Sequence, residues 1–245
     1  MDQDLPVRRV VRVRHELKRR ELDVVAVDRP SPGFLAITFG GESLADFVSG
    51  SFDDHVKFLV PDAGGTLVGR DYTPRRFSRA DRTLVIEFAM HGDGHADRWA
   101  QQAAVGQRVT VGGPRGSMII PMDYAWHLLA GDSAALPAIC RRLEELPAGA
   151  HAIVVVQADA ADRRPLSGAA DLDLQWVSTA DELVTAIRDL RLPPGEGFAW
   201  AAGEAAVMAR LRQVLLQDKH HPREAMRVAA YWKRGAQAHH ETLDD

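Results

Sequence analysis

Short apolar runs separated by turn residues make up most of the first half of the chain. Runs at 24–27, 35–39, 55–60, 84–88, 108–111 and 117–120 have the length and β-branched content of strands, and Pro and Gly residues stand between them. One helix, over about 96–104, interrupts the series, and Trp99 on it is expected to face the strands. This half of the chain is therefore predicted to form an antiparallel barrel or sandwich.

From Trp126 onward the rhythm changes to strands that alternate with helices. Runs at 127–130, 151–157, 174–177 and 197–201 predict strands, and periodic segments at 136–143, 183–190 and 205–216 predict helices. Strands separated by helices indicate a doubly wound parallel sheet. The rhythm changes near 121–125, so we expect two domains, covering 1–123 and 124–245.

The composition is that of an ordinary folded protein. The 245 residues are 46% apolar and 26% charged, and the net charge of −4 gives no general attraction to nucleic acid. No run is long and apolar enough for a signal-peptide core or a membrane span. The basic opening segment, up to Arg20, is expected to be solvated, with an anionic-surface patch as the alternative.

Cysteine and histidine usage argues against disulfides and metal sites. The single cysteine, Cys140, excludes an intramolecular disulfide and cysteine-rich zinc or iron–sulfur sites, which fits a reducing cytoplasm. Cys140 itself is expected to be buried filler. The histidine pairs 220–221 and 239–240 are expected at exposed helix ends and in the tail, and no metal site is predicted.

Two strand ends in the second half carry small residues where a ligand could bind. Gly131-Asp132 follows the first strand of the predicted parallel sheet, and Gly203-Glu204 follows the last. Ligands of such sheets bind at the carboxyl ends of the strands. Either glycine alone is accounted for by turn geometry, but together they favour a crevice. Neither stretch is a dinucleotide fingerprint or a Walker loop, which disfavours an ordinary Rossmann dehydrogenase or a P-loop NTPase.

The segment 70–78 concentrates the chemistry of the first half. It reads Arg-Asp-Tyr-Thr-Pro-Arg-Arg-Phe-Ser, with three guanidinium groups, aromatic rings and hydroxyls in nine residues. Such a set suits a planar ligand that bears phosphate, because guanidinium groups bind phosphate and rings stack. The alternative is a charged hairpin with one half-buried tyrosine.

Arg70-Asp71-Tyr72-Thr73 matches the Arg-x-Tyr-Thr/Ser flavin motif of the ferredoxin–NADP reductase superfamily. More narrowly, the chain resembles the siderophore-interacting proteins, which are flavin-dependent ferric-siderophore reductases. The resemblance implies a flavin-binding β-barrel followed by a nicotinamide-binding α/β domain, with the C-terminal segment returning towards the flavin. The matching stretches follow the family order at 54–57, 70–77, 91–100, 112–117, 131–139, 200–205 and 231–235.

The resemblance implies roles for individual residues in binding FAD. Arg70 would meet the phosphate region, Tyr72 would lie against the isoalloxazine ring, and Thr73 would bond near its N5 edge. The segment from His91 into the helix, with Gly94, Ala96, Asp97 and Trp99, would hold the pyrophosphate. Here the chain departs from the family, which commonly has Gly-Pro-Ala-Ser where this sequence has Gly94-His95-Ala96-Asp97. A carboxylate repels phosphate, but it also caps a helix well.

The electron donor implied by the resemblance is NADPH or NADH, with ferredoxin as an alternative. Gly131, Asp132, Gly203 and Glu204 would flank the nicotinamide nucleotide, and Trp232 would contribute to the cofactor site. Arg163 and Arg164 follow a predicted strand and either bind a 2′-phosphate or form a solvated loop pair.

The implied activity is the reduction of ferric siderophores, with no obligatory protein acid or base. Reduction releases iron because ferrous iron suits hard oxygen ligands less well. An anionic chelate would be attracted by Lys57, Arg115, Lys233 and Arg234, each of which could equally form a surface salt bridge. The alternatives are another flavin or ferredoxin reductase and a binding protein that holds a ferric siderophore without turnover. A cytoplasmic monomer with no nucleic-acid or integral membrane partner is expected.

Overall fold

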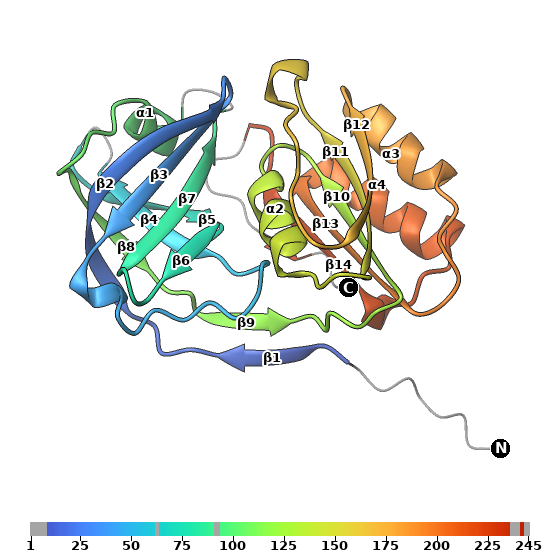
Figure 1. Ribbon diagram of the computed structural model, residues 1–245. Coiled ribbons are helices and arrows are strands. Elements are labelled where there is room, and N and C mark those ends of the chain that lie inside the picture. The colour runs from blue at the N-terminus through green and yellow to red at the C-terminus, as the bar shows by residue number, and fades with distance from the viewer. Residues whose placement is uncertain (1–8, 62–63, 91–93, 236–240, 243–245) are drawn as a thin grey trace.

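The computed structural model describes residues 9–61, 64–90, 94–235 and the backbone of 241–242. Two β-sheet units stand side by side, and a two-stranded ribbon runs along one end of both (Figure 1). The ribbon pairs β1 (Val11–Arg14) with β9 (Gly116–Ile119) in antiparallel fashion. No helix in the described part of the chain is long and apolar enough to cross a membrane.

The first unit is a seven-stranded antiparallel sheet in the order β5-β4-β8-β2-β3-β7-β6. Buried and partly exposed residues alternate along β7 and, from Leu35 onward, along β3. This alternation is what one solvated and one buried sheet face require. The strands are β2 (Arg19–Ser31), β3 (Phe34–Gly40), β4 (Val56–Pro61), β5 (Leu67–Tyr72), β6 (Arg76–Ser78), β7 (Thr83–Ala89) and β8 (Arg108–Gly112).

The sheet rolls up around an aromatic core, which confirms the predicted barrel. Tyr72, on the edge strand β5, packs against Phe88 on β7 with ring centroids 4.5 Å apart, so strands from opposite ends of the sheet meet. Helix α1 (His95–Gln101) covers the core, and the Trp99 ring lies 4.8 Å from that of Phe58. Trp99 therefore faces the strands as its sequence context predicts.

The second unit is a parallel sheet in the order β12-β11-β10-β13-β14, with the short β15 antiparallel at its edge. This order and the intervening helices confirm the doubly wound arrangement. The strands are β10 (Trp126–Gly131), β11 (His151–Gln157), β12 (Asp171–Val177), β13 (Gly197–Glu204), β14 (Met226–Trp232) and β15 (Glu241–Thr242). The helices are α2 (Leu136–Glu145), α3 (Ala180–Asp189) and α4 (Ala205–Gln213).

Several strands were not expected from the hydrophobic pattern. The missed strands are β1, β5, β6, β14 and β15. Both β1 and β5 lack a buried face, since every residue of β1 is exposed and none of β5 is fully buried. They exist because a neighbouring strand satisfies their backbone groups, and an apolar pattern does not report that. The predicted helix 205–216 continues past α4 as one turn of π-helix over Val214–Asp218.

Helix α2 joins the two units through buried arginines. Arg141 donates to the Ser49 carbonyl oxygen at 3.0 Å and to the Pro74 carbonyl oxygen at 2.9 Å, both in loops of the barrel unit. Arg142 donates to the Pro121 carbonyl oxygen at 2.8 Å. Each guanidinium is buried, so these contacts fix the position of one sheet against the other.

Two expectations about charged side chains are wrong. Arg20, in the basic opening segment, is buried and its guanidinium lies 2.9 Å from Asp46, so the segment is not uniformly solvated. His221 is also buried and bonds to the Ala225 carbonyl at 2.9 Å, whereas its neighbour His220 is exposed as expected. Residues 239–240 lie outside the described part of the chain. Cys140 is buried, as predicted.

Candidate cofactor cleft

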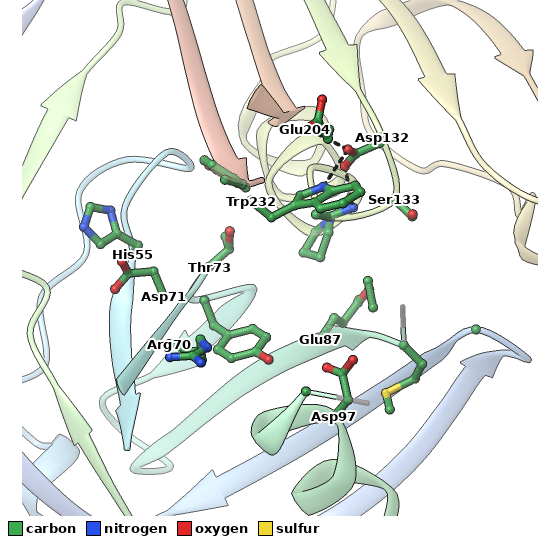
Figure 2. Close-up of a pocket in the computed structure, with 18 of the residues that line it drawn as sticks. His55, Arg70, Asp71, Thr73, Glu87, Asp97, Asp132, Ser133, Glu204 and Trp232 are labelled. Carbon is green, nitrogen blue, oxygen red and sulfur yellow. Dashed lines mark hydrogen bonds between the residues drawn. The ribbon is translucent and has the colours of Figure 1, made fainter. Parts of the chain in front are cut away.

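A cleft of about 1770 Å³ lies between the barrel and the carboxyl ends of the parallel strands. Figure 2 shows Arg70, Thr73, Glu87 and Asp97 on the barrel side of it, with Asp132, Ser133, Glu204 and Trp232 opposite. Pockets for one drug-sized ligand usually enclose about 300–1000 Å³. The cleft is therefore large enough for more than one ligand molecule.

Strand β5 brings the flavin-motif residues to the cleft. Arg70 donates to the carbonyl oxygen of its neighbour Gly69 at 2.9 Å, and no carboxylate of the described residues forms a salt bridge with it. The Tyr72 ring rests on Phe88, and burial raises the pKa of its hydroxyl, which therefore stays protonated. The barrel thus presents an uncompensated guanidinium beside an aromatic ring.

Thr73 belongs to a buried network that crosses from the barrel to β14. Its hydroxyl bonds to Tyr231, whose own hydroxyl donates to Asp53 Oδ1 across 3.4 Å. Asp53 also accepts from the indole nitrogen of Trp200 at 2.8 Å and from Arg227 Nε at 2.5 Å. Asp53 is buried, and its carboxylate joins a barrel loop to both β13 and β14.

Asp132 holds three strand ends of the parallel sheet together. Its Oδ2 accepts from the Glu204 backbone nitrogen at 2.9 Å and from the Trp232 indole at 2.8 Å. Its Oδ1 accepts from the Ala134 nitrogen at 2.9 Å. The side chain borders the cleft, and these three hydrogen bonds fix Trp232 and the loop ends around the cleft.

The two glycines predicted to border a ligand have packing reasons of their own. A Cβ on Gly131 would lie 2.2 Å from the Ala202 carbonyl oxygen, and one on Gly203 would lie 2.6 Å from Asp132 Oδ2. Glu204 caps helix α4, accepting from the nitrogens of Ala206 at 2.7 Å and Val207 at 3.1 Å. Close packing around the two glycines and the helix cap made by Glu204 therefore account for these residues without a ligand. The loops that contain them still form one wall of the cleft.

The predicted pyrophosphate segment reaches the cleft only in part. Gly94 and Asp97 line it, whereas Ala96 is buried and Trp99 packs against the barrel core, and neither lines the cleft. Any role of Ala96 or Trp99 in cofactor binding would fall to their backbone. His91 lies outside the described residues.

The four predicted substrate residues are not equivalent. Lys57 Nζ lies 2.7 Å from Asp71 Oδ1, which is the salt bridge that the sequence left as its alternative. Arg115 and Arg234 are exposed and line the cleft, whereas Lys233 is exposed but does not line it. The structure thus brings three of the four to the cleft, and the charge of Lys57 is already balanced.

A buried ion-pair network between the two units was missed by sequence reasoning. Glu87 of the barrel pairs with Arg164 from the second unit and with Arg75, whose Nε lies 3.2 Å away. Arg75 also binds Glu144 of α2 through two bonds of 2.7 Å. Arg164 is therefore neither solvated nor available for a 2′-phosphate. No local signal could have found this network, because its members are distant in sequence.

The residues at the cleft fit FAD in most respects. An arginine without a salt bridge to any described carboxylate, a buried hydroxyl and an aromatic face suit a phosphate-bearing planar ligand, and Arg70, Thr73 and Tyr72 supply them within four residues at one strand end. Among the described residues of the predicted pyrophosphate segment, the Asp97 carboxylate opposes an anion. The site therefore fits the cofactor, although the Asp97 carboxylate would repel its pyrophosphate.

Comparison with known proteins gives coherent matches over nearly the whole chain. A family profile described as siderophore-interacting protein matches residues 124–235, and one described as siderophore-interacting FAD-binding domain matches residues 23–69 and 65–118. The NADPH-dependent ferric-chelate reductase of Escherichia coli is 35% identical, over 90% of this chain and 95% of that protein. Ferric vibriobactin reductase ViuB of Vibrio cholerae is 30% identical, over 91% and 93%. The crystal structure of a siderophore utilization protein from T. fusca superposes with a TM-score of 0.85 at 33% identity, covering 93% of this chain and 97% of that one.

Proposed function

The chain belongs to the siderophore-interacting protein family, and we propose on this basis that it is an FAD-dependent reductase that passes electrons from NADPH to ferric siderophores. The observation that carries the proposal is the cleft, in which the Arg70 to Thr73 motif faces the carboxyl ends of the parallel strands. Both walls come from one chain, which supports a monomer as the functional unit. We place the reaction in the cytoplasm, where NADPH is available.

The protein contributes positioning and electrostatics to this reaction. NADPH delivers two electrons as a hydride and each ferric ion accepts one, so one NADPH reduces two ferric chelates. Bound FAD supplies the conversion between the two-electron donor and the one-electron acceptor. Arg70 would hold its phosphate and Tyr72 its ring, while the Asp132–Trp232 bond keeps the opposite wall in place. Ferrous iron then leaves the chelate because it binds hard oxygen ligands less tightly.

Arg163 is our candidate for the 2′-phosphate of NADPH. It lies just after β11 and donates to Ser178 Oγ at 2.7 Å, beyond the end of β12, at the edge of the sheet where an adenosine ribose binds in such folds. The nearby Asp162 is unavailable to a ribose because it accepts from the Gly33 nitrogen at 2.7 Å. Arg163→Gln should raise KM for NADPH and leave KM for NADH nearly unchanged. Equal effects on both donors would remove the assignment.

The function is tested by cofactor content and stoichiometry. The purified protein should show flavin absorbance that bleaches with NADPH, and added ferric siderophore should yield two ferrous ions per NADPH, trapped by a ferrous-specific chelator. Arg70→Ala should weaken FAD binding about 30-fold, which corresponds to about 2 kcal/mol for a charge-assisted contact. A protein that binds ferric siderophore but neither FAD nor NADPH would instead be a binding module, the alternative that the Asp97 carboxylate would permit if flavin binding were lost.

The Asp97 carboxylate gives a second check on the FAD assignment. Asp97→Asn keeps the side-chain shape and removes the charge, so FAD should bind about two- to fivefold more tightly if the carboxylate faces phosphate. Weaker binding would show that Asp97 matters for holding α1, which begins at His95. Fluorescence titration of apoprotein with FAD measures both variants.

A further inference from the structure

The connection between β11 and β12 leaves the parallel sheet and reaches the barrel. It contains a 3₁₀ turn over Ala160–Asp162, after which Arg163 has an extended backbone with φ −69° and ψ 118°. Figure 1 shows this connection beside the β2–β3 hairpin of the barrel, and a hydrogen bond joins the two. Asp162 lines the cleft from the connection and Gly33 lines it from the hairpin. The two units therefore touch at this end of the cleft.

Successive side chains of the β11–β12 connection contact different units. The Asp162 carboxylate contacts the barrel, where its Oδ1 accepts from the Gly33 nitrogen at 2.7 Å. Arg163 contacts the sheet and donates to Ser178 Oγ at 2.7 Å, and Arg164 contacts the barrel again through its ion pair. An extended backbone places successive side chains on opposite sides in this way. Arg163 does not itself line the cleft, so its reach towards a ligand there depends on where the barrel contacts hold the connection.

The barrel side of this contact is anchored in the core. The Gly33 carbonyl oxygen accepts from the Met90 nitrogen at 2.8 Å, which ties the hairpin to the end of β7. The next residue, Phe34, is fully buried. The Arg164 guanidinium carbon lies 5.1 Å from the centroid of the Phe34 ring, a cation–π contact in addition to its ion pair. The connection therefore rests on a fixed part of the barrel at two points, one on each side of Arg163.

The hairpin leaves room for the carboxylate because residue 33 has no side chain. A Cβ on Gly33 would lie 2.2 Å from Asp162 Oδ2 and 2.8 Å from Asp162 Cγ, so the carboxylate would have to move. The Gly33 backbone does not have a positive φ, and a side chain there would be free of backbone strain. Asp162 is buried at 9% exposure. The missing side chain at 33 therefore serves the close approach of Asp162.

We propose that Asp162 is a positioning residue for the electron donor: by holding the β11–β12 connection on the barrel, it places the Arg163 guanidinium for the 2′-phosphate of NADPH. The preference for the phosphorylated donor then depends on Gly33, which is 129 residues from Asp162 in the sequence and belongs to the other unit. A carboxylate repels a nearby phosphate, so Asp162 can favour NADPH only through position. This inference rests on the proposed function, because it takes Arg163 as the residue that binds the 2′-phosphate.

Binding of two adenosine fragments measures this role without electron transfer. Adenosine 2′,5′-bisphosphate carries the 2′-phosphate of NADPH and 5′-AMP lacks it, so the ratio of their dissociation constants reports the 2′-phosphate contact. Isothermal titration calorimetry with the purified, FAD-loaded protein gives both constants for each variant.

Asp162→Ala should weaken binding of the bisphosphate about threefold, within the range for one exposed charge contact, and leave binding of 5′-AMP unchanged. If charge alone acted, removal of the carboxylate would tighten binding, so the sign of the effect separates position from electrostatics. Asp162→Asn keeps an oxygen for the Gly33 nitrogen and should bind the bisphosphate at least as tightly as the unmodified protein does. Asp159→Ala is the matched control, because it removes an exposed carboxylate of the same connection that also lines the cleft, and it should not weaken binding.

Two double variants show through which residues Asp162 acts. Gly33→Ala should weaken binding of the bisphosphate as Asp162→Ala does, because the added methyl group displaces the carboxylate, and the two together should cost no more than either alone. Arg163→Gln should lose the preference for the bisphosphate over 5′-AMP. Adding Asp162→Ala to Arg163→Gln should cause no further loss.

The inference is overturned if Asp162→Ala binds the bisphosphate as tightly as the unmodified protein, or more tightly, because Arg163 would then need no support from the barrel. Equal weakening of both fragments would mean that the substitution disturbs the whole adenosine site, and additive losses with Arg163→Gln would mean that Asp162 acts through another group. An unchanged ratio in Arg163→Gln alone would remove the 2′-phosphate assignment and the positioning role with it. The reductase itself is judged separately, by bleaching of the flavin with NADPH in the unmodified protein.

Discussion

Removing the charge of Asp53 should loosen the junction between the barrel and the parallel sheet. The Asp53 side chain is 3% exposed and binds Arg227 Nε at 2.5 Å and the indole of Trp200 at 2.8 Å. Asp53→Asn keeps an oxygen for Trp200 but removes the carboxylate charge that lies 2.5 Å from the Arg227 guanidinium, which is itself 12% exposed. The substitution is nearly isosteric, so its effect reports charge and not packing.

The size of the loss follows from the burial of the pair. Removing one partner of a buried ion pair costs about 3–5 kcal/mol, because the other charge stays desolvated. Arg227 retains some exposure and a flexible stem, which places the expected loss near the lower end, at about 3 kcal/mol. That is a large share of the roughly 5–15 kcal/mol that stabilises most proteins. Urea unfolding followed by tryptophan fluorescence should show a correspondingly lower midpoint.

A control variant and a double-mutant cycle make the test specific. Asp218→Asn removes the acid of the Arg188–Asp218 pair, in which both side chains are about half exposed, and should cost less than about 1 kcal/mol. In the cycle of Asp53→Asn with Arg227→Met, the double variant should be more stable than the sum of the single losses predicts, by about 2 kcal/mol. A loss no larger than that of the control, with additive single effects, would refute the reasoning.

Three further outcomes follow from the structure. Burial lowers the pKa of His127 to about 4, so as the pH falls the unfolded chain takes up a proton before the folded protein does. The free energy of unfolding should therefore fall by about 3 kcal/mol as the pH drops from 6.5 to 4. His127→Asn should flatten that part of a urea-unfolding series. Burial acts to raise the pKa of Glu144, but hydrogen bonds from Arg75 and Arg76 bring it to about 2. The contribution of Glu144 to the free energy of unfolding is therefore present above pH 4.5 and lost between pH 4.5 and 2, and Glu144→Gln should remove this dependence. Gly203→Ala should displace the Asp132 carboxylate and cost about 1–2 kcal/mol, with a change in near-ultraviolet circular dichroism; an unchanged spectrum would show that the loop absorbs the methyl group.

The sequence by itself determined the two architectures and the location of the main chemical motif. Short β-branched runs bounded by turn residues, such as β3 and β7, predict an antiparallel sheet, and strands spaced by periodic helices predict a parallel one. Arg70, Tyr72 and Thr73 are neighbours in the chain, so their grouping needs no tertiary information. These features rest on local periodicity and adjacency, which one sequence displays directly.

The tertiary structure alone decided which charged side chains are free and which are used within the fold. Glu87 and Arg164 are 77 residues apart, and Asp53 and Trp200 are 147 apart, so only folding brings either pair together. Lys57 and Asp71 meet through the register of β4 with β5, whereas Arg19 on the same face forms no salt bridge with any carboxylate of the described residues. The sequence alone does not distinguish an arginine that is solvated from one that is buried in an ion-pair network or one that faces a ligand. Its role depends on the distance to the nearest carboxylate and on the water that folding removes.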